Sequence, residues 1–306
     1  MKRLMVIFVL IVALVLTGCQ QQNESEPAET DSAETEQAEI TNNPNDSPDE
    51  TEQVGTEGLE FFPLTDGTYS VSVGTARNIE NIIIPSNYNG KSVTAIESNG
   101  FKDAKLTSIT IPNSVTTIGN AAFGGCSELT NITIPNGVTS LGESAFANCS
   151  GLTSITLPSS VTKIADCTFI GCTSLSSITI PDSVTEIGYL AFQHCEELTS
   201  IAIPDSVTTI GKGAFELCTS LTSITIPNRV ATIEAYVFIN CSSLTSITIP
   251  ESVTVIKSAF RYCENLETIT FNGSVSQWMA IQKQNYWHDD IPVTKVVCTD
   301  GEVNLK

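Results

Sequence analysis

The sequence predicts a solenoid of stacked coils, and three observations support this fold class. Prolines recur at an unbroken interval of 23 residues, at Pro112, Pro135, Pro158, Pro181, Pro204, Pro227 and Pro250. The residues before each proline repeat one pattern, for example LTNITIP at residues 129–135. The segments at both ends depart from this pattern, as the ends of an open stack must. A repeat of this length offers an extended surface rather than a reaction pocket.

Each coil is expected to contain a short half-buried strand, with apolar side chains directed inward and polar side chains outward. One inward column is leucine, at Leu106, Leu129, Leu152, Leu175, Leu198, Leu221, Leu244 and Leu266. The next is isoleucine, at Ile109, Ile132, Ile155, Ile178, Ile201, Ile224, Ile247 and Ile269. The proline after each strand has no N–H to donate, so it ends the strand and begins a corner.

After the corner comes an apolar pair, such as Val138 and Leu141, and then a short turn with a phenylalanine column. The column consists of Phe101, Phe123, Phe146, Phe169, Phe192, Phe215, Phe238 and Phe260. The turn segment is too short for a standard helix, so a single helical or 3₁₀ turn is predicted. The coils therefore carry parallel strands on one face and short turns on the other.

The pattern LxxIxIPxxVxxIGxxAFxxC resembles the repeat of the BspA-like leucine-rich-repeat family, a bacterial surface class. The resemblance covers residues 80–271 and recurs in about eight coils. It implies a curved leucine-rich-repeat solenoid that functions in adhesion and protein contacts.

The stack is expected to have a cap at each end, with residues 59–105 forming an N-terminal cap and a degenerate first coil. Residues 106–271 form the solenoid, and residues 272–306 form the C-terminal cap. Residues 61–73 predict two strands around an Asp66-Gly67 turn. Residues 278–281 predict a short helix, and residues 291–298 predict a closing strand. Trp278, Tyr286 and Trp287 form either the core of this cap or a ligand-stacking cluster.

The first 18 residues predict a lipoprotein signal peptide. Lys2 and Arg3 precede an apolar run that is too short to span a membrane as a permanent helix. The LTGC sequence at residues 16–19 resembles the bacterial lipobox. This resemblance implies cleavage before Cys19 and attachment of lipid to its thiol, so the mature protein would be anchored at the cell surface. A secretory signal with an unrelated cysteine is the alternative.

Residues 19–58 predict an acidic disordered tether, because large apolar residues are nearly absent there. Thirteen acidic residues and no basic ones lie within residues 20–60. Self-repulsion of these charges extends the segment and lifts the solenoid away from the membrane. Residues 61–306 contain 21 acidic and 12 basic residues, a net charge of −9. This charge argues against nucleic-acid binding and against direct docking on anionic lipid, which leaves the lipid anchor as the membrane contact.

The cysteine pattern favours reduced, buried thiols over disulfides. Seven of the ten cysteines form one column in register with the repeat, from Cys126 to Cys263. Ala104 takes the same position in the first coil, so the site requires a small buried group. Cys167 and Cys298 lie outside the column and are the candidates for redox chemistry.

No catalytic, cofactor-binding or metal-binding residue is predicted. The chain has no CxxC motif, and its two histidines, His194 and His288, lack a nucleophile and an orienting acid at a recognisable spacing. Gly-rich phosphate loops, nucleophile elbows and calcium loops are likewise absent from the sequence. The protein is therefore expected not to be an enzyme and to need no cofactor.

Two surfaces are candidates for binding. The first is the outward threonine column of the strands, represented by Thr133, Thr156, Thr179 and Thr225. The second is the variable turn, where Tyr189, His194, Arg229, Tyr236, Arg261 and Tyr262 break the repeat. Tyrosine and arginine are typical of binding hot spots. Generic polar strand residues and sequence drift on an unconstrained face remain the alternative explanations.

These observations predict a non-catalytic, lipid-anchored cell-surface protein whose leucine-rich-repeat solenoid mediates adhesion. Its expected partners are proteins, including host or neighbouring-cell surface proteins, or surface glycans. A structural lipoprotein that spaces the envelope and a glycan-binding surface module are the two alternatives.

Overall fold

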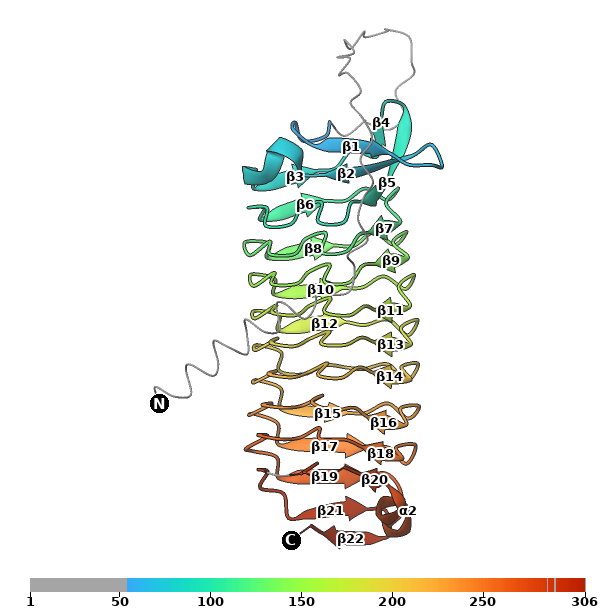
Figure 1. Cartoon of the computed structure of the whole chain (residues 1–306), viewed down its shortest axis with the longest axis vertical. Helices are drawn as coiled ribbons and strands as arrows, with labels where there is room; N and C mark the ends of the chain where they lie inside the picture. The colour runs from blue at the N-terminus through green and yellow to red at the C-terminus, as the bar shows by residue number, and fades with distance from the viewer. Residues whose placement is uncertain (1–53, 285, 289, 306) are drawn as a thin grey trace, which may run out of the picture. The chain divides into compact units, whose positions relative to one another are not determined.

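Two columns of short parallel strands run along the stack of coils, in a computed structural model that describes residues 54–284, 286–288 and 290–305 (Figure 1). The predicted signal peptide, Cys19 and residues 19–53 of the predicted tether lie outside the described residues. The predicted fold class, a leucine-rich-repeat solenoid, is confirmed. Among the described residues, none of the helices has the length and apolar character needed to cross a membrane.

The first strand column contains the Ile-Thr segments that precede the prolines. It comprises β6 (Ser108–Thr110), β8 (Asn131–Thr133), β10 (Ser154–Thr156), β12 (Ser177–Thr179), β15 (Ser223–Thr225), β17 (Ser246–Ile249) and β19 (Thr268–Phe271). Neighbouring strands pair in parallel with identical positions opposite each other, for example Ile155 with Ile178. Because the register equals the repeat, the inward isoleucines of paired strands lie opposite their equivalents in the next coil. The inward leucines and most of these isoleucines are buried, as predicted.

The second strand column follows the proline corner and was not anticipated from the sequence. It comprises the two-residue strands β7 (Thr117–Ile118), β9 (Ser140–Leu141), β11 (Lys163–Ile164), β13 (Glu186–Ile187), β14 (Thr209–Ile210), β16 (Thr232–Ile233) and β18 (Val255–Ile256). Ile187, for instance, pairs with Ile164 and Ile210 in the coils on either side. Two residues are too few to show a period of two in the sequence, so the prediction missed these strands.

The segment that carries each phenylalanine forms short turns, as predicted, and none of them is long enough to be assigned as a helix. Its backbone N–H groups alternate between two kinds of hydrogen bond. The N–H of Phe123 donates to the carbonyl of Ala145 in the next coil at 2.8 Å, whereas the N–H of Gly124 donates back to Ala121 at 2.9 Å. This alternation ties each turn to its neighbour and puts residues such as Ala121 (φ 50°) and Gly125 (φ 75°) in the left-handed region.

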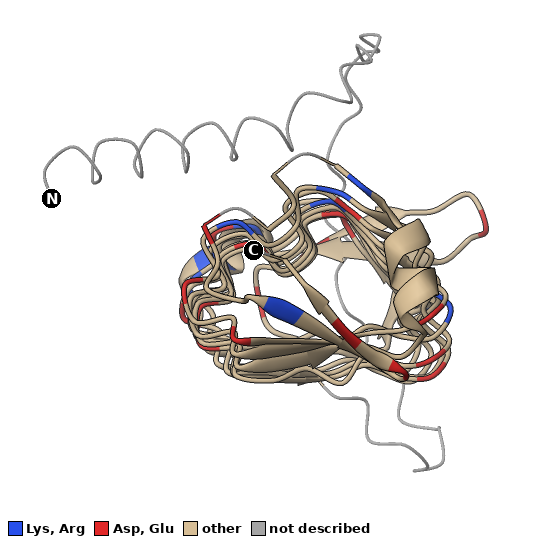
Figure 2. Cartoon of the chain, turned by 90° about the horizontal axis from the view of Figure 1, so that it is seen from below, with Lys and Arg blue, Asp and Glu red and all other residues tan. Residues whose placement is uncertain are grey.

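The core of the stack is a column of phenylalanine rings beside a column of thiols. Adjacent rings lie 5.3–5.8 Å apart between centroids and within 18° of parallel. The seven column cysteines are free, buried thiols. Each donates its S–H to the carbonyl of the phenylalanine one coil earlier, at Sγ–O distances of 3.0–3.3 Å. Figure 2 views the coils along the stack and shows acidic and basic residues around the outer rim.

The N-terminal end of the stack is closed by a hairpin and an irregular first coil. β1 (Glu60–Pro63) pairs antiparallel with β2 (Tyr69–Ser72), and the 3₁₀ helix η1 (Gly74–Asn78) follows. β2 and β7 flank β5 (Lys91–Ile96) in parallel, β4 (Asn87–Tyr88) pairs antiparallel with β5, and β3 (Asn81–Ile83) pairs with β6.

The C-terminal end carries the short helix α2 (Val275–Ala280), which begins with a capping box between Ser274 and Gln277. β20 (Gln282–Lys283) and β21 (Lys295–Cys298) extend the two strand columns, and β22 (Gly301–Asn304) pairs antiparallel with β21. The strand predicted for residues 291–298 is therefore confined to its second half. Pro292 has no N–H to contribute to an earlier start.

Candidate binding surfaces

The first candidate surface is the hydroxyl face, which we define as the outward side chains Thr133, Thr156, Thr179 and Thr225 of the first strand column. All four are exposed. Parallel pairing sets Thr156 between Thr133 and Thr179 in adjacent strands. Within the described part of the chain, none of their hydroxyls has a hydrogen-bond partner, so they remain available to a ligand. In contrast, Thr153 and Thr245 use their hydroxyls on carbonyls of the preceding coil.

A groove of about 440 Å³ lies on the hydroxyl face between β8 and β10. Thr133, Thr156, Asn131, Ser154 and Asn136 supply its polar lining. The face is interrupted once, where residues 199–203 are not assigned to a strand and Ala202 replaces the threonine. The interruption divides the threonine row into one part over β8, β10 and β12 and another that starts at β15.

The second candidate surface is the tyrosine edge, defined here as Tyr189, Tyr236 and Tyr262 together with the cations Lys212 and Arg261. The three tyrosines are 40–42% exposed. The ammonium of Lys212 lies 4.8 Å from the ring centroid of Tyr236, and the guanidinium of Arg261 lies 5.0 Å from that of Tyr262. Such cation–π pairs contribute about 0.5–1 kcal/mol at exposed sites. The edge therefore presents exposed aromatic rings, two of them beside a cation.

The remaining predicted residues of the variable turn are not all on this edge. His194 lies in the same turn as Tyr189, and its Nδ1 is 3.2 Å from Oε1 of Glu196. Arg261 also contacts Asp290, at 3.8 Å. Arg229 is exposed but lies in the corner after Pro227, away from the turns. There it replaces the serine that in other coils, such as Ser183 and Ser206, donates to a valine carbonyl one coil earlier at 2.6 Å.

Sequence reasoning missed a polar cluster beneath the tyrosine edge. Gln193 is 1% exposed, and its Nε2 donates to Oε2 of Glu216 at 3.0 Å. Burial raises the pKa of the Glu216 carboxyl, and the hydrogen bond from Gln193 opposes this shift. Burial also raises the pKa of Tyr189, with a further contribution from the negative charge of Glu216. The position after the column phenylalanine varies from coil to coil, with Ile170 and Ile239 but also Lys102 and Arg261, so the sequence gives no clear signal for this pair.

Across the described residues, no set of three or more His, Cys, Asp or Glu side chains is arranged to hold a metal ion. The buried thiols are also poorly suited to reaction, because burial raises the pKa of Cys126, Cys172 and Cys263 to about 12. A thiol with such a pKa is almost entirely protonated at neutral pH, and the thiolate is the reactive form.

The stacked coils, their uniform core and their two exposed polar surfaces define a repeat protein of the solenoid class. Residues 94–201 and 185–280 match the family model of the BspA type leucine-rich repeat region, which together is more than half of the chain. The chain therefore belongs to the BspA-type leucine-rich repeat family.

Solved structures that are similar to this chain include three leucine-rich or leucine-rich repeat proteins from bacteria. One from T. pallidum is 25% identical, with 71% of this chain and 91% of that chain covered and a TM-score of 0.48. Another, from Bacteroides ovatus, is 26% identical, with 80% and 70% covered and a TM-score of 0.48. A leucine rich cell surface protein from Faecalibacterium prausnitzii is 26% identical, with 78% and 98% covered and a TM-score of 0.37. No curated protein matches the chain.

Proposed function

We propose that this chain is a non-catalytic, lipid-anchored surface protein whose solenoid binds other proteins through the tyrosine edge. Membership of the BspA-type family supports a binding role for the repeats. The lipobox-like sequence that ends at Cys19 supports export and anchoring, and the acidic segment of residues 19–58 would hold the solenoid away from the membrane.

The observation that carries the proposal is the set of exposed tyrosines on an otherwise regular stack. Tyr236 and Tyr262 each have a cation beside the ring, and burial together with the charge of Glu216 raises the pKa of Tyr189. A tyrosine ring offers a large contact area with few side-chain torsions to fix, so it loses little conformational entropy on association, and tyrosine is common in hot spots. The protein partner is expected to come from a host or a neighbouring cell.

The test uses the full-length chain immobilised through its N-terminus, with a panel of extracellular-matrix and cell-surface proteins in solution. Saturable binding is expected to fall at least tenfold in the Tyr189→Ala/Tyr236→Ala variant. Thr139→Ala/Thr162→Ala, on the exposed corner of other coils, is the matched control and should leave binding unchanged. Binding that the tyrosine substitutions do not affect would reject the tyrosine edge.

A glycan ligand is the second candidate, favoured by the groove of about 440 Å³ on the hydroxyl face. Free hydroxyls and the amides of Asn131 and Asn136 can exchange hydrogen bonds with sugar hydroxyls. Competition by a soluble polysaccharide, together with loss of binding in Thr133→Val/Thr156→Val, would support it. Binding that survives both changes would exclude this groove.

A further inference from the structure

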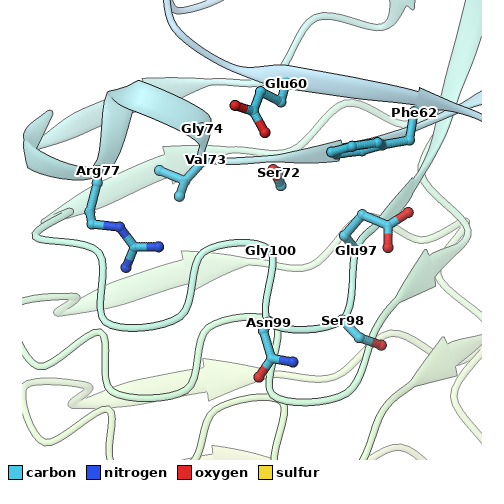
Figure 3. A pocket seen from close by; sticks show the side chains of 10 residues that line it. All are labelled: Glu60, Phe62, Ser72, Val73, Gly74, Arg77, Glu97, Ser98, Asn99 and Gly100. Atoms are coloured by element: carbon cyan, nitrogen blue, oxygen red, sulfur yellow. The ribbon is translucent and has the colours of Figure 1, made fainter. Parts of the chain in front are cut away.

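A second cavity, of about 470 Å³, opens where the N-terminal cap meets the first coil. It lies between the hairpin of β1 and β2, the helix η1 and the turn of residues 97–100 (Figure 3). Six residues carry its chemistry: Glu60, Phe62, Arg77, Glu97, Ser98 and Asn99. None of them belongs to the hydroxyl face or the tyrosine edge, so the cavity is separate from the surfaces in the proposed function.

The cavity exists because the hairpin does not reproduce the hydrogen bonds that a preceding coil would make. In the body of the stack, every second turn N–H donates to a carbonyl of the next coil, as Asn99 does to Asn120 at 2.8 Å. At the cap, the N–H of Val73 donates to the Gly100 carbonyl at 2.8 Å, and Nη1 of Arg77 donates to the Lys102 carbonyl at 2.6 Å. The Ser98 carbonyl, equivalent to that of Asn120, receives no hydrogen bond from the described residues.

The carboxylates of Glu60 and Glu97 add further hydrogen-bond acceptors to the Ser98 carbonyl. The side chain of Glu60 packs over Gly74, where an added Cβ would lie 2.8 Å from its Cγ. Glu97 accepts a hydrogen bond from the hydroxyl of Ser70, a residue that is 1% exposed. Neither Glu60 nor Glu97 forms an ion pair within the described residues. The cavity thus gathers hydrogen-bond acceptors whose negative charge is not compensated by a salt bridge.

The wall of the cavity also has an apolar part. The ring of Phe62 is 42% exposed and borders the cavity on the side of Glu97, and Val73 contributes to its floor (Figure 3). Arg77 is the one basic residue in the lining, and its Nη1 donates to the Lys102 carbonyl. Glu60 and Glu97 outnumber this single guanidinium, so the lining keeps a net negative charge. It therefore favours an occupant with a positive charge, several N–H donors and an apolar stem.

We infer that this cavity takes a basic side chain, arginine or lysine, of a partner polypeptide. The guanidinium or ammonium head would donate to Glu60, Glu97 and the Ser98 carbonyl in charge-assisted hydrogen bonds. The methylene stem would pack against Phe62 and Val73, because long basic side chains bury their stems while the head meets charge. The face of Phe62 adds cation–π attraction. The inference goes beyond the proposed function and stands independently of the tyrosine edge.

The test titrates the peptide acetyl-Ala-Arg-Ala-amide into the full-length chain in detergent micelles and follows binding by calorimetry. The same peptide with citrulline in place of arginine keeps the shape but removes the charge, and it should bind at least tenfold more weakly. The Glu60→Gln/Glu97→Gln variant should lose at least tenfold in affinity. Glutamine can still accept from Ser70, so the cap keeps this hydrogen bond. Glu143→Gln, at an exposed acid of another coil, is the matched control and should bind as the unaltered chain does.

Four results would overturn the inference: no saturable binding of the arginine peptide, equal binding of the citrulline peptide, unchanged affinity in the double variant, or equal loss in Glu143→Gln. Spermidine that binds tenfold more tightly than the arginine peptide would instead identify a free polyamine as the ligand and reject a polypeptide partner. If the double variant unfolds at a lower temperature than the unaltered chain, the single variant Glu60→Gln becomes the test of the site. Glu60 is exposed, so this substitution should not disturb the fold. That variant should lose at least threefold in affinity, and an unchanged affinity would reject the site.

Discussion

The aromatic core differs between the body of the solenoid and its C-terminal cap. In the body, eight phenylalanines stack in parallel, as Phe192 and Phe215 do at 5.4 Å and 1°. At the cap, Trp278 and Trp287 contact Phe271 and Phe260 of the last coil and each other at angles of 60–76°. Parallel stacking arises because each coil repeats the position of the last, and it leaves an apolar face at either end of the column. At the C-terminal end, aromatic residues outside the repeat cover that face through edge-to-face contacts. The repeat therefore builds the body, and the non-repeating cap ends the stack.

The largest effect that separates the two regions is expected from Phe192→Ala. The ring is fully buried between Phe169 and Phe215, so its removal leaves a cavity that identical neighbours cannot fill. The free energy of unfolding should fall by about 3–5 kcal/mol, measured by urea denaturation. A loss below about 1 kcal/mol would mean that the ring column is not the core of the body.

A smaller and more local effect is expected from Trp278→Ala in the cap. Trp278 is 1% exposed and contacts both Phe271 and Trp287. Its loss should cost about 3 kcal/mol, at the low end of the range for tryptophan truncation, because the cap can partly close over the gap. Each coil contacts only its neighbours, so amide hydrogen exchange should quicken most in β19, β21 and β22. An equal increase in β8 and β10 would show that the cap and the body unfold as one unit.

The thiol column is a property of the body, and it should make stability fall at alkaline pH. Burial raises the pKa of Cys172 from 9.0 to about 12, so above pH 9 the unfolded chain loses this proton while the folded chain keeps it. The unfolded state then binds fewer protons, and the free energy of unfolding falls as the pH rises from about 9 towards 12. Between pH 9 and pH 10 one such thiol accounts for about 1 kcal/mol.

Urea denaturation of Cys172→Ala at both pH values measures this contribution. The variant should show a fall between pH 9 and pH 10 that is smaller by about 1 kcal/mol than that of the unaltered chain. Thr162→Ala, at an exposed residue, is the control and should leave the fall unchanged. An identical pH dependence in Cys172→Ala would contradict the assignment of a protonated buried thiol.

The same contrast explains what the sequence can predict. The leucine, isoleucine and phenylalanine columns can be predicted because the same apolar residue type recurs at the same position of every coil, which indicates that the position is buried. The thiol-to-carbonyl bonds, the alternating turn bonds and the strand Thr117–Ile118 cannot be read from the sequence, because they depend on how the backbone folds and on contacts between neighbouring coils. The exposed tyrosines were predicted, whereas the Gln193–Glu216 pair and the cavity at Glu60 and Glu97 depend on how single residues meet in space.

Arg229 allows two coils of the body to be compared, because it stands where the neighbouring coils have a serine in the corner after the proline. Ser206 donates to the Val184 carbonyl at 2.6 Å, and Ser252 donates to the Val230 carbonyl at 2.8 Å. Arg229→Ser should restore the equivalent bond and raise the free energy of unfolding by about 0.5–1.5 kcal/mol, whereas Ser206→Ala should lower it by a similar amount. If Arg229 serves binding, Arg229→Ser should also weaken capture of a protein partner while it stabilises the fold. A variant that is neither more stable nor weaker in binding would show that neither the corner hydrogen bond nor a binding contact constrains this position.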